Sequence, residues 1–307
     1  MTFAKPKSNT EHSMKPNVLF FTTIAASALL AGAVQAQPVA SHYPVGVEGI
    51  KGASLPPPGL YARDYNIFYT ANDFPDGPAH FDAFVYVNAP RLIWMSPWKI
   101  LGATYGADVI VPFGYSDLKI EGQKFSTFGL GDIQVEPLLL SWNRDRYDIA
   151  FGYAVWAPTG DFDRNDPSCQ GAGFWSHMLT LGGTLFFDAE KTWALSLLNR
   201  YEFNHENDDI DITPGQVYTL EWGLSKSLKK TIDVGVIGYY QQQTTDDSGS
   251  GAVYDRSVHD RVFGIGPEIS LFCPKLGLFT ALRYNYEFSA EQRPEGHRIA
   301  LTFTYRF

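Results

Sequence analysis

The amino-acid sequence predicts an all-β fold, an up-and-down antiparallel transmembrane β-barrel of about 12 strands. Three observations support this prediction. Segments with a period of two follow one another from Leu60 onward, their connections alternate between short and long, and the chain ends on the alternating segment LTFTYRF. Period-two alternation is typical of strands with one buried face. A soluble domain usually leaves its last residues to fray in water, whereas Phe307 looks structural.

The composition agrees with many short strands and disagrees with a helical membrane protein. Of the 307 residues, 15% are aromatic, 19% are charged and 28 are glycines. Charged residues usually make up about a quarter of a soluble chain. The mean hydropathy is only −0.15, which excludes a bundle of long apolar helices.

Residues 1–36 are predicted to be a secretory signal peptide. Lys15 precedes an apolar run, Val18 to Ala33, and Val34-Gln35-Ala36 follows as a small-residue cleavage pattern. This order is that of an n-region, an h-region and a cleavage site. Met14 is an alternative start. An uncleaved anchoring helix is the other interpretation, which the short run with its threonines disfavours.

The charge and the cysteines narrow the class further. Loss of three lysines and one glutamate with residues 1–36 would move the formal net charge from −9 to −11. An acidic exported protein without a basic patch is not expected to bind nucleic acid. Cys169 and Cys273 are the only cysteines. They fall in connections at opposite ends of the predicted barrel, so we do not expect them to pair.

A Pro/Gly-rich N-terminal segment, 37–59, precedes the barrel, 60–307. The segment contains LPPPG at 55–59, and proline cannot donate a hydrogen bond to a central strand. It either threads into the lumen as a plug or lies in the periplasm. The predicted strands are 60–70, 81–95, 98–111, 129–142, 147–158, 174–187, 193–204, 215–228, 231–243, 257–272, 276–287 and 297–307.

The connections between these strands indicate a Gram-negative outer-membrane barrel, with outer-membrane lipid and lipopolysaccharide as its surroundings. Short periplasmic turns and longer extracellular loops alternate in such barrels. The predicted short turns are Ser96-Pro97, Asn143–Arg146, Asp188–Thr192, Lys229-Lys230 and Cys273–Lys275. The predicted long loops are 71–80, 112–128, 159–173, 205–214, 244–256 and 288–296. LTFTYRF is then the closing strand, and Phe307 resembles the terminal signal that the barrel-assembly machinery reads.

The alternation also predicts which side chains face the lumen. A lysine or arginine that faces lipid at mid-depth costs about 2–4 kcal/mol, so charged residues should turn inward. The predicted lumen acids are Asp108, Asp132, Glu136, Asp148, Glu202, Glu221, Asp233, Glu268 and Glu287. The predicted lumen bases are Arg200 and Arg283, and the aromatic candidates are Trp156 and Tyr239. Any one of these residues could instead pack and pair to fill the barrel.

The sequence carries no signature of catalysis, and we expect neither an enzyme nor a cofactor. Ser176 and His177 are neighbours on one predicted strand, so they point to opposite faces and cannot readily share a site. Asp161, Asp163 and Asn165 have the spacing of the first three ligands of a calcium loop, but the sixth position is aspartate and the twelfth alanine. They remain weak candidates for a surface cation, and no metal site is predicted.

Four stretches resemble the outer-membrane family labelled "meta-pathway of phenol degradation", which includes SphA-like proteins. They are ASLPPPGLYARDYN (53–66), GLGDIQVEPLLLSW (129–142), VWAPTGDFD (155–163) and QQQTTDDSGSGA (241–252). Asp132, Pro137, Pro158, Thr159 and Gly160 match the family motifs. The resemblance runs from about residue 42 to Phe307 and implies a transporter-like barrel. The family label rests on pathway association, so it assigns no binding residues.

The expected function is an outer-membrane channel that passes small hydrophobic or aromatic compounds by passive facilitated diffusion. An acidic lumen disfavours anions, and aromatic side chains offer stacking surfaces. Two alternatives stay open: a narrow cation-preferring porin, and a structural or adhesive barrel that transports nothing.

Overall fold

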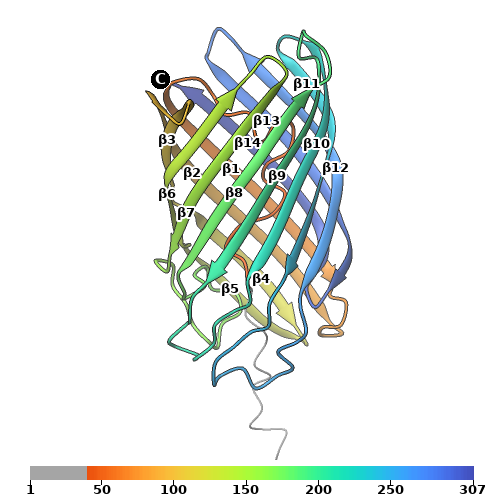
Figure 1. Cartoon of the computed structure of the whole chain (residues 1–307). Helices are drawn as coiled ribbons and strands as arrows, with labels where there is room; N and C mark the ends of the chain where they lie inside the picture. The colour runs from red at the N-terminus through yellow and green to blue at the C-terminus, as the bar shows by residue number, and fades with distance from the viewer. Residues whose placement is uncertain (1–39) are drawn as a thin grey trace, which may run out of the picture. The chain divides into compact units, whose positions relative to one another are not determined.

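The computed structural model describes residues 40–307, so the predicted signal peptide lies outside the described residues. Figure 1 shows the strands tilted around a common axis. Their bounds are β1 (Gly59–Asp73), β2 (Phe81–Ile100), β3 (Ala103–Ile110), β4 (Phe113–Ile120), β5 (Gln123–Leu130), β6 (Ile133–Asn143), β7 (Tyr147–Ala157), β8 (Ser176–Phe186), β9 (Trp193–Asn204), β10 (Val217–Lys229), β11 (Ile232–Gln243), β12 (Arg261–Cys273), β13 (Leu278–Glu291) and β14 (Glu295–Arg306).

The wall is a closed antiparallel barrel of twelve strands, as predicted. The sheet runs from β1 through β14 down to β6, then to β3 and β2, and β2 pairs with β1 to close it. The closing strands pair as predicted, with Tyr61 opposite Arg306. Closure gives each strand of this wall two neighbours, which lipid requires because it offers no hydrogen bonds, and among the described strands β5 alone pairs with a single neighbour, β4.

The predicted loop 112–128 was wrong, because these residues continue two wall strands as the hairpin β4–β5. β3 and β4 pair with β2 in one register, with Arg91 opposite Ile110 and Asn88 opposite Phe113. Pro112 separates β3 from β4 because it has no N–H to donate. Residues 131 and 132 separate β5 from β6 next to Pro112, whose carbonyl accepts from the Gly131 N–H at 2.8 Å, and the hairpin lies at the long-loop end of the wall (Figure 1).

Two predicted connections also differ from the structure. Ser96-Pro97 is not a turn but lies inside β2, where the pairing register shifts between Met95 and Lys99. The chain instead reverses at Leu101 and Gly102, whose φ angles are 51° and 77°. The expected long loop 288–296 is a turn of 292–294, because β13 and β14 extend further than their alternation indicated.

The outer surface has the layered composition of a membrane barrel. Aliphatic side chains are exposed at mid-strand: Leu181, Leu197, Leu224, Val236, Ile269 and Leu282. Aromatic side chains are exposed toward the short-turn end: Trp94, Trp98, Tyr147, Trp193, Tyr305 and Phe307. Others are exposed toward the long-loop end: Phe68, Phe84, Phe203 and Phe288. Aromatic girdles flank the apolar band of outer-membrane barrels in this way. None of the described residues forms a helix long and apolar enough to span a membrane.

Asp64 contradicts the expectation that charged side chains turn inward. It alternates with the inward-facing Tyr65 and lies opposite Pro90 and Phe303, which are exposed on the outer face. The amides of Asn66 and Asn88 each donate to its carboxylate at 2.8 Å. These two hydrogen bonds replace the water that lipid excludes, which offsets part of the desolvation of the carboxylate.

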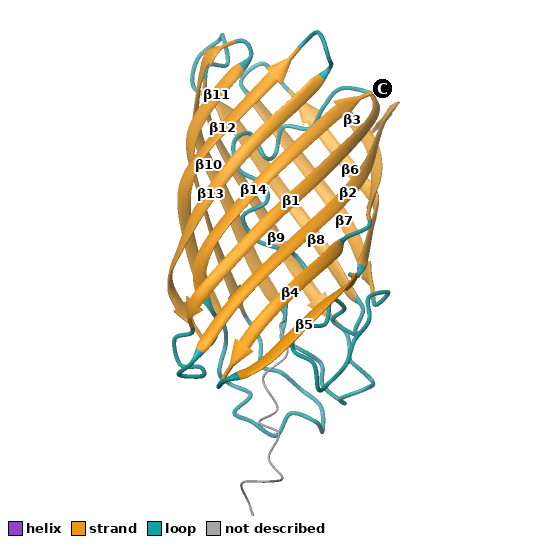
Figure 2. Ribbon diagram, turned by 180° about the vertical axis from the view of Figure 1, so that it is seen from behind, coloured by secondary structure: helices purple, strands orange, loops and turns teal. Residues whose placement is uncertain are grey.

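Residues 40–58 pass through the lumen from the long-loop end to the short-turn end, where β1 begins. Figure 2 shows this chain inside the barrel, behind β1 and β14. At its outer end, Asn204 at the end of β9 donates to the carbonyl of Ala40 at 2.6 Å. At its inner end, the Tyr61 hydroxyl donates to the carbonyl of Pro57 at 2.7 Å. The segment therefore occupies the space that the wall encloses.

We predict that Gly114 on β4 holds the loop between β7 and β8 in place by leaving room for Gln170. A Cβ at Gly114 would lie 1.7 Å from Gln170 Oε1, whereas a Cβ at Gly129, its partner on β5, would lie 3.7 Å from Gln170 Cγ. Gly114→Ala should therefore displace the Gln170 amide, break its hydrogen bonds to Ser116 and to the carbonyl of Thr127, and speed tryptic cleavage after the exposed Arg164, measured on folded protein. Gly129→Ala is the matched control, and equal cleavage rates in the two variants would contradict the prediction.

Candidate functional site

A cavity of about 410 Å³ runs beside the lumen segment. The segment forms one side of it, and the inner faces of β1, β2 and β6–β9 form the other. At the long-loop end its lining includes Pro112, Gly114 and Gln170, and toward the short-turn end it includes Leu55 and Phe279. The cavity thus follows the direction in which a solute would cross the membrane.

The part of the cavity nearer the long-loop end is apolar, and we call it the apolar chamber. Its lining side chains belong to one buried hydrophobic cluster and come from the segment and five strands: Val47, Ile67, Val87, Ala89, Ile110, Trp156 and Met178. The sequence folds this way because the inward positions of β1 and β2 are apolar at this level. Such a surface favours apolar and aromatic solutes over ions.

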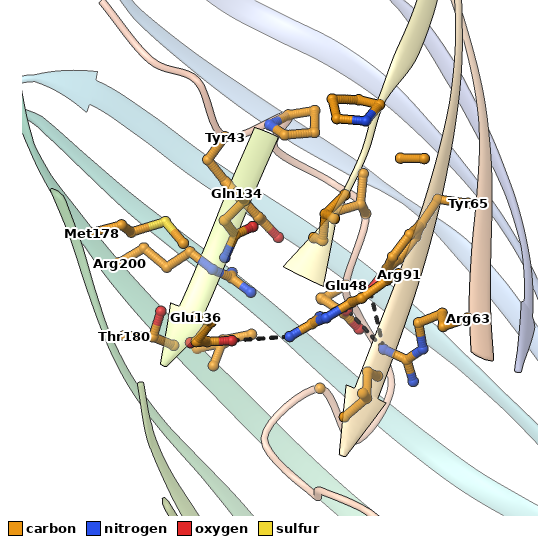
Figure 3. Close-up of a pocket in the computed structure, with 18 of the residues that line it drawn as sticks. Tyr43, Glu48, Arg63, Tyr65, Arg91, Gln134, Glu136, Met178, Thr180 and Arg200 are labelled. Carbon is orange, nitrogen blue, oxygen red and sulfur yellow. Dashed lines mark hydrogen bonds and ion pairs between the residues drawn. The ribbon is translucent and has the colours of Figure 1, made fainter. Parts of the chain in front are cut away.

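A belt of charged side chains crosses the cavity on the short-turn side of the apolar chamber (Figure 3). Arg91 lies 2.6 Å from Asp108 and 3.0 Å from Glu136. Arg63 lies 2.9 Å from Glu48 of the segment, and the Tyr65 hydroxyl donates to the same carboxylate at 2.6 Å. We call these side chains the charge belt. Because Glu48 belongs to the segment and its partners to the wall, the belt joins the two.

Polar atoms of the site remain unpaired within residues 40–307. Trp156 Nε1, Arg91 Nε and Asp108 Oδ1 are buried and have no hydrogen-bond partner among the described residues. A buried donor without a partner costs about 1–3 kcal/mol. Two of these atoms are donors beside the cavity, so an oxygen acceptor on a solute would satisfy them.

Asp132 joins the segment, the wall and the loop between β7 and β8. Its carboxylate accepts from the backbone N–H groups of Gly160 at 2.9 Å and Ala172 at 2.8 Å. His42 Nε2 lies 3.2 Å from the same carboxylate, and His42 Nδ1 lies 2.8 Å from Ser176 Oγ. Because all three side chains are buried, the contacts fix the outer end of the segment to the wall.

The two family motifs meet at this joint. The Thr159 hydroxyl donates to the carbonyl of Gly131 at 3.2 Å and accepts from the N–H of Ile133 at 2.9 Å. Gly160 packs against Gly171 so closely that a Cβ at Gly160 would lie 2.7 Å from the Gly171 Cα. The motif residues therefore bind one another across the break between β5 and β6.

Asp166 attaches the loop between β7 and β8 to the β4–β5 hairpin through hydrogen bonds. Thr127 on β5 and the Ser168 side chain both donate to its carboxylate, at 2.8 Å and 2.6 Å. Burial raises the pKa of Asp166, but hydrogen bonds from Ser168 and Thr127 outweigh it and hold the pKa below its usual range. The carboxylate is thus ionised at neutral pH, and these bonds weaken only as the pH falls through that lowered pKa.

The predicted lumen residues divide into three groups in the structure. Those that line the cavity are Asp132, Glu136, Trp156, Arg200, Asp233 and Arg283. Those that accept hydrogen bonds from the segment are Glu202, Glu221 and Glu268. The others are buried in the lumen wall without lining the cavity: Asp108, Asp148, Tyr239 and Glu287.

The loop candidates and the cysteines do not form sites in the described part of the chain. Asp163 accepts from the backbone N–H of Asn165 in a local turn, and no group of three metal-ligating residues within 40–307 could hold a metal ion. Asp161 is exposed. Cys169 and Cys273 are both free, as expected. His177 bonds Tyr153 on the outer face, so it does not share a site with the inward-facing Ser176.

Sequence reasoning missed several charged residues of the lumen: His42, Glu48, Arg63, Arg91 and Arg298, the last of which lies 3.7 Å from Glu287. The segment residues His42 and Glu48 follow no strand periodicity, so no signal placed them. A signal did exist for the three arginines, since the cost of a lipid-facing charge already requires a mid-strand arginine to turn inward. The mixed polarity on both faces of β1 and β2 obscured it.

The fold and the lumen define the class: an outer-membrane β-barrel, located in the outer membrane, that carries its own N-terminal segment in the lumen. The chain belongs to the family described as "Putative MetA-pathway of phenol degradation", whose model matches residues 69–303. No curated protein sequence matches the chain.

Two solved structures share the fold at low sequence identity. The COG4313 outer membrane channel from Pseudomonas putida F1 is similar with a TM-score of 0.73 and 16% identity, over 87% of this chain and 100% of that chain. The beta domain of the Bordetella autotransporter BrkA has a TM-score of 0.51 and 13% identity, over 81% of this chain and 99% of that chain. At these identities the comparisons show the architecture of the barrel.

We predict that Asp132→Ala lowers the free energy of unfolding by about 3 kcal/mol, because it leaves two backbone donors without their buried acceptor and removes the carboxylate that lies 3.2 Å from His42 Nε2. Urea unfolding in lipid vesicles, followed by tryptophan fluorescence, measures the change. Asp161→Ala is the control, in the loop between β7 and β8 that Asp132 contacts, since that side chain is exposed and should change stability by less than about 0.5 kcal/mol. Equal effects of the two substitutions would refute the role of Asp132.

Proposed function

We propose that the protein is a channel that passes small hydrophobic or aromatic compounds across the outer membrane by passive facilitated diffusion. The observation that carries this proposal is the cavity along the lumen segment, with its apolar chamber above the charge belt. A wide porin would present a more uniformly polar wall. An apolar chamber instead favours a solute that leaves water readily.

Two donors unpaired within residues 40–307, one in the apolar chamber and one in the charge belt, would make the cavity select aromatic compounds that carry an oxygen over plain hydrocarbons. A solute ring would pack against Trp156 and Met178 in the apolar chamber, where it buries apolar surface. An oxygen on that ring would accept from Trp156 Nε1 or Arg91 Nε, the two buried donors without a partner among the described residues. Phenols, aromatic carbonyl compounds and aromatic acids all combine these two features, whereas plain hydrocarbons lack the second.

Passage of a solute requires the loop between β7 and β8 and the lumen segment to move, since Gln170 lines the long-loop end of the cavity and the segment lines one side of it. No energy source is needed, because a concentration gradient across the membrane drives diffusion through a transient opening. A structural or adhesive barrel is the competing function, and it would bind no solute in the chamber.

We also propose that Phe307 is the recognition point for the barrel-assembly machinery. Its N–H donates to the carbonyl of Leu60 at 3.0 Å, so the last residue completes the seam between β14 and β1. The ring itself is 69% exposed and contributes little to packing. A free aromatic ring at the closing seam is available to a partner during assembly.

We predict that Trp156→Phe weakens the binding of phenol about fivefold and leaves the binding of toluene unchanged. The substitution keeps an aromatic ring but removes the N–H donor, and one hydrogen bond contributes about 1 kcal/mol. Equilibrium dialysis of the detergent-solubilised protein with labelled phenol and toluene measures both. Trp175→Phe is the control, because Trp175 is exposed on the outside.

Uptake of labelled phenol by a deletion strain, complemented with the wild-type or variant chain, connects binding to transport. Binding without faster uptake would exclude the channel function. Absence of binding to the wild-type chain, together with an altered envelope in the deletion strain, would favour the structural barrel.

A further inference from the structure

The lumen segment is held against one side of the wall by carboxylates that accept from its backbone. Glu202 accepts from the N–H of Tyr43 at 3.0 Å. Glu221 accepts from the N–H groups of Gly46 at 2.8 Å and Glu48 at 3.1 Å. A peptide N–H normally bonds to a carbonyl, so this row of charged acceptors is an unusual way to bind a chain.

The same row continues toward the short-turn end. Glu268 accepts from the N–H of Ile50 at 2.8 Å, and Asp233 lies 2.8 Å from Lys51 Nζ. The carboxylates come from four neighbouring strands, β9 to β12, and from the outer to the inner end of the segment they follow in the order β9, β10, β12 and β11. We call Glu202, Glu221, Glu268 and Asp233 the carboxylate track.

Asn285 on β13 shows that the segment does not complete the site it occupies. The side chain is 0% exposed, and neither its Nδ2 nor its Oδ1 has a hydrogen-bond partner within residues 40–307. It points at the segment, since a Cβ at Gly46 would lie 3.3 Å from Asn285 Nδ2. A different occupant could satisfy both atoms of the amide, which the segment leaves unsatisfied.

The carboxylate track and its arginine partners carry a net negative charge when the charges of the segment are left out. Arg200 lies 2.5 Å from Glu221, and Arg283 lies 3.1 Å from Glu268. Four carboxylates thus face two guanidinium groups, which leaves a formal charge of −2. Among residues 40–58, Lys51 forms an ion pair with the track. In a lumen with low-dielectric walls, such a charge concentrates cations strongly.

We propose that the carboxylate track is a binding site for linear cationic amines, and that the segment occupies it as a built-in substitute. A di- or polyamine is a flexible chain with N–H donors at intervals, as is the segment, and it carries the positive charge that peptide N–H groups lack. This proposal rests on the proposed channel function, but its carboxylates lie on β9 to β12, whereas the side chains of the apolar chamber come from the segment and from β1, β2, β3, β7 and β8. Movement of the segment therefore opens a cation path.

Two glycines of the segment allow the track to be opened without changing the wall. Gly46 has a φ of +84°, and a Cβ there would lie 2.7 Å from Tyr239 Cε1. A Cβ at Gly49 would lie 2.2 Å from Glu268 Oε2 and 2.8 Å from Ile237 Cγ2. The double variant G46A/G49A should therefore displace the segment. Gly52→Ala is the matched control, because its nearest contact would be 3.3 Å from a single carbonyl oxygen.

The test is planar-bilayer conductance of the full-length chain, with folding verified by heat-modifiable gel mobility. We expect G46A/G49A to conduct K⁺ over Cl⁻ by about tenfold, the lower end of the enrichment that a charged cleft produces. Spermidine should block this current, and G52A should behave as the wild type. Adding E221Q to the open variant should weaken the spermidine block several-fold. A non-selective or anion-selective current, or a current that spermidine does not affect, would overturn the proposal.

A second measurement covers the case in which the substitutions do not free the segment. Spermidine and the segment compete for the same carboxylates, so spermidine should speed tryptic cleavage after Lys51 in the wild-type chain. E221Q should reduce this acceleration, and an unchanged cleavage rate would overturn the proposal. Trp156→Phe should alter neither spermidine effect, because Trp156 is not on the track. Failure of the aromatic site and failure of the amine site are therefore distinguishable.

Discussion

Lipid offers no hydrogen bonds, and the organisation of this molecule follows from that constraint. Every strand must find two neighbours, so the sheet closes through β1, β2 and β14. Closure with twelve strands encloses more space than side chains alone can fill, since about eight strands already make a lumen just wide enough for them. The chain fills the excess with its own residues 40–58. The segment brings peptide groups into the lumen, and these groups must in turn be satisfied by the wall.

The wall satisfies the peptide N–H groups of the segment with carboxylates, and these carboxylates determine the charge pairing on both sides of the lumen. Each buried carboxylate needs donors or cations to offset its desolvation. On one side the segment supplies donors to Glu202, Glu221 and Glu268. On the other side arginines pair with Asp108, Glu136 and Glu48. The space between the segment and this second side remains as the cavity, which the charge belt crosses where Glu48 meets Arg63.

The sequence was sufficient to predict the architecture of the barrel, but it was not sufficient to predict the residues of the site. Alternation and loop lengths predicted twelve strands because both follow from lipid on one face and connections at two ends. The hairpin β4–β5 was not predicted because Pro112 and Gly131 look like the limits of a loop, although Gly131 donates a hydrogen bond to Pro112 and the strands resume after the break. Periodicity placed wall residues such as Glu221 on the inner face. It could not show that Glu48, from a segment without periodicity, would meet Arg63.

Glu48 couples the two sides of the lumen, and the coupling has a measurable consequence. It belongs to the segment on the carboxylate track, yet its carboxylate pairs with Arg63 at 2.9 Å and approaches Arg91 at 4.0 Å in the charge belt. Displacement of the segment would remove one negative charge from the belt and leave Arg63 without this partner. An amine on the track should therefore favour an anionic aromatic compound in the cavity.

Linkage requires this effect to be reciprocal, so each ligand should tighten the binding of the other by the same factor. Isothermal titration of benzoate, with and without spermidine, measures the factor, and titration of phenol supplies the uncharged comparison. We expect spermidine to tighten benzoate binding more than phenol binding. Equal factors for the two compounds would mean that the departure of Glu48 does not change the electrostatic potential of the charge belt. The amine site and the aromatic site would then be independent of each other.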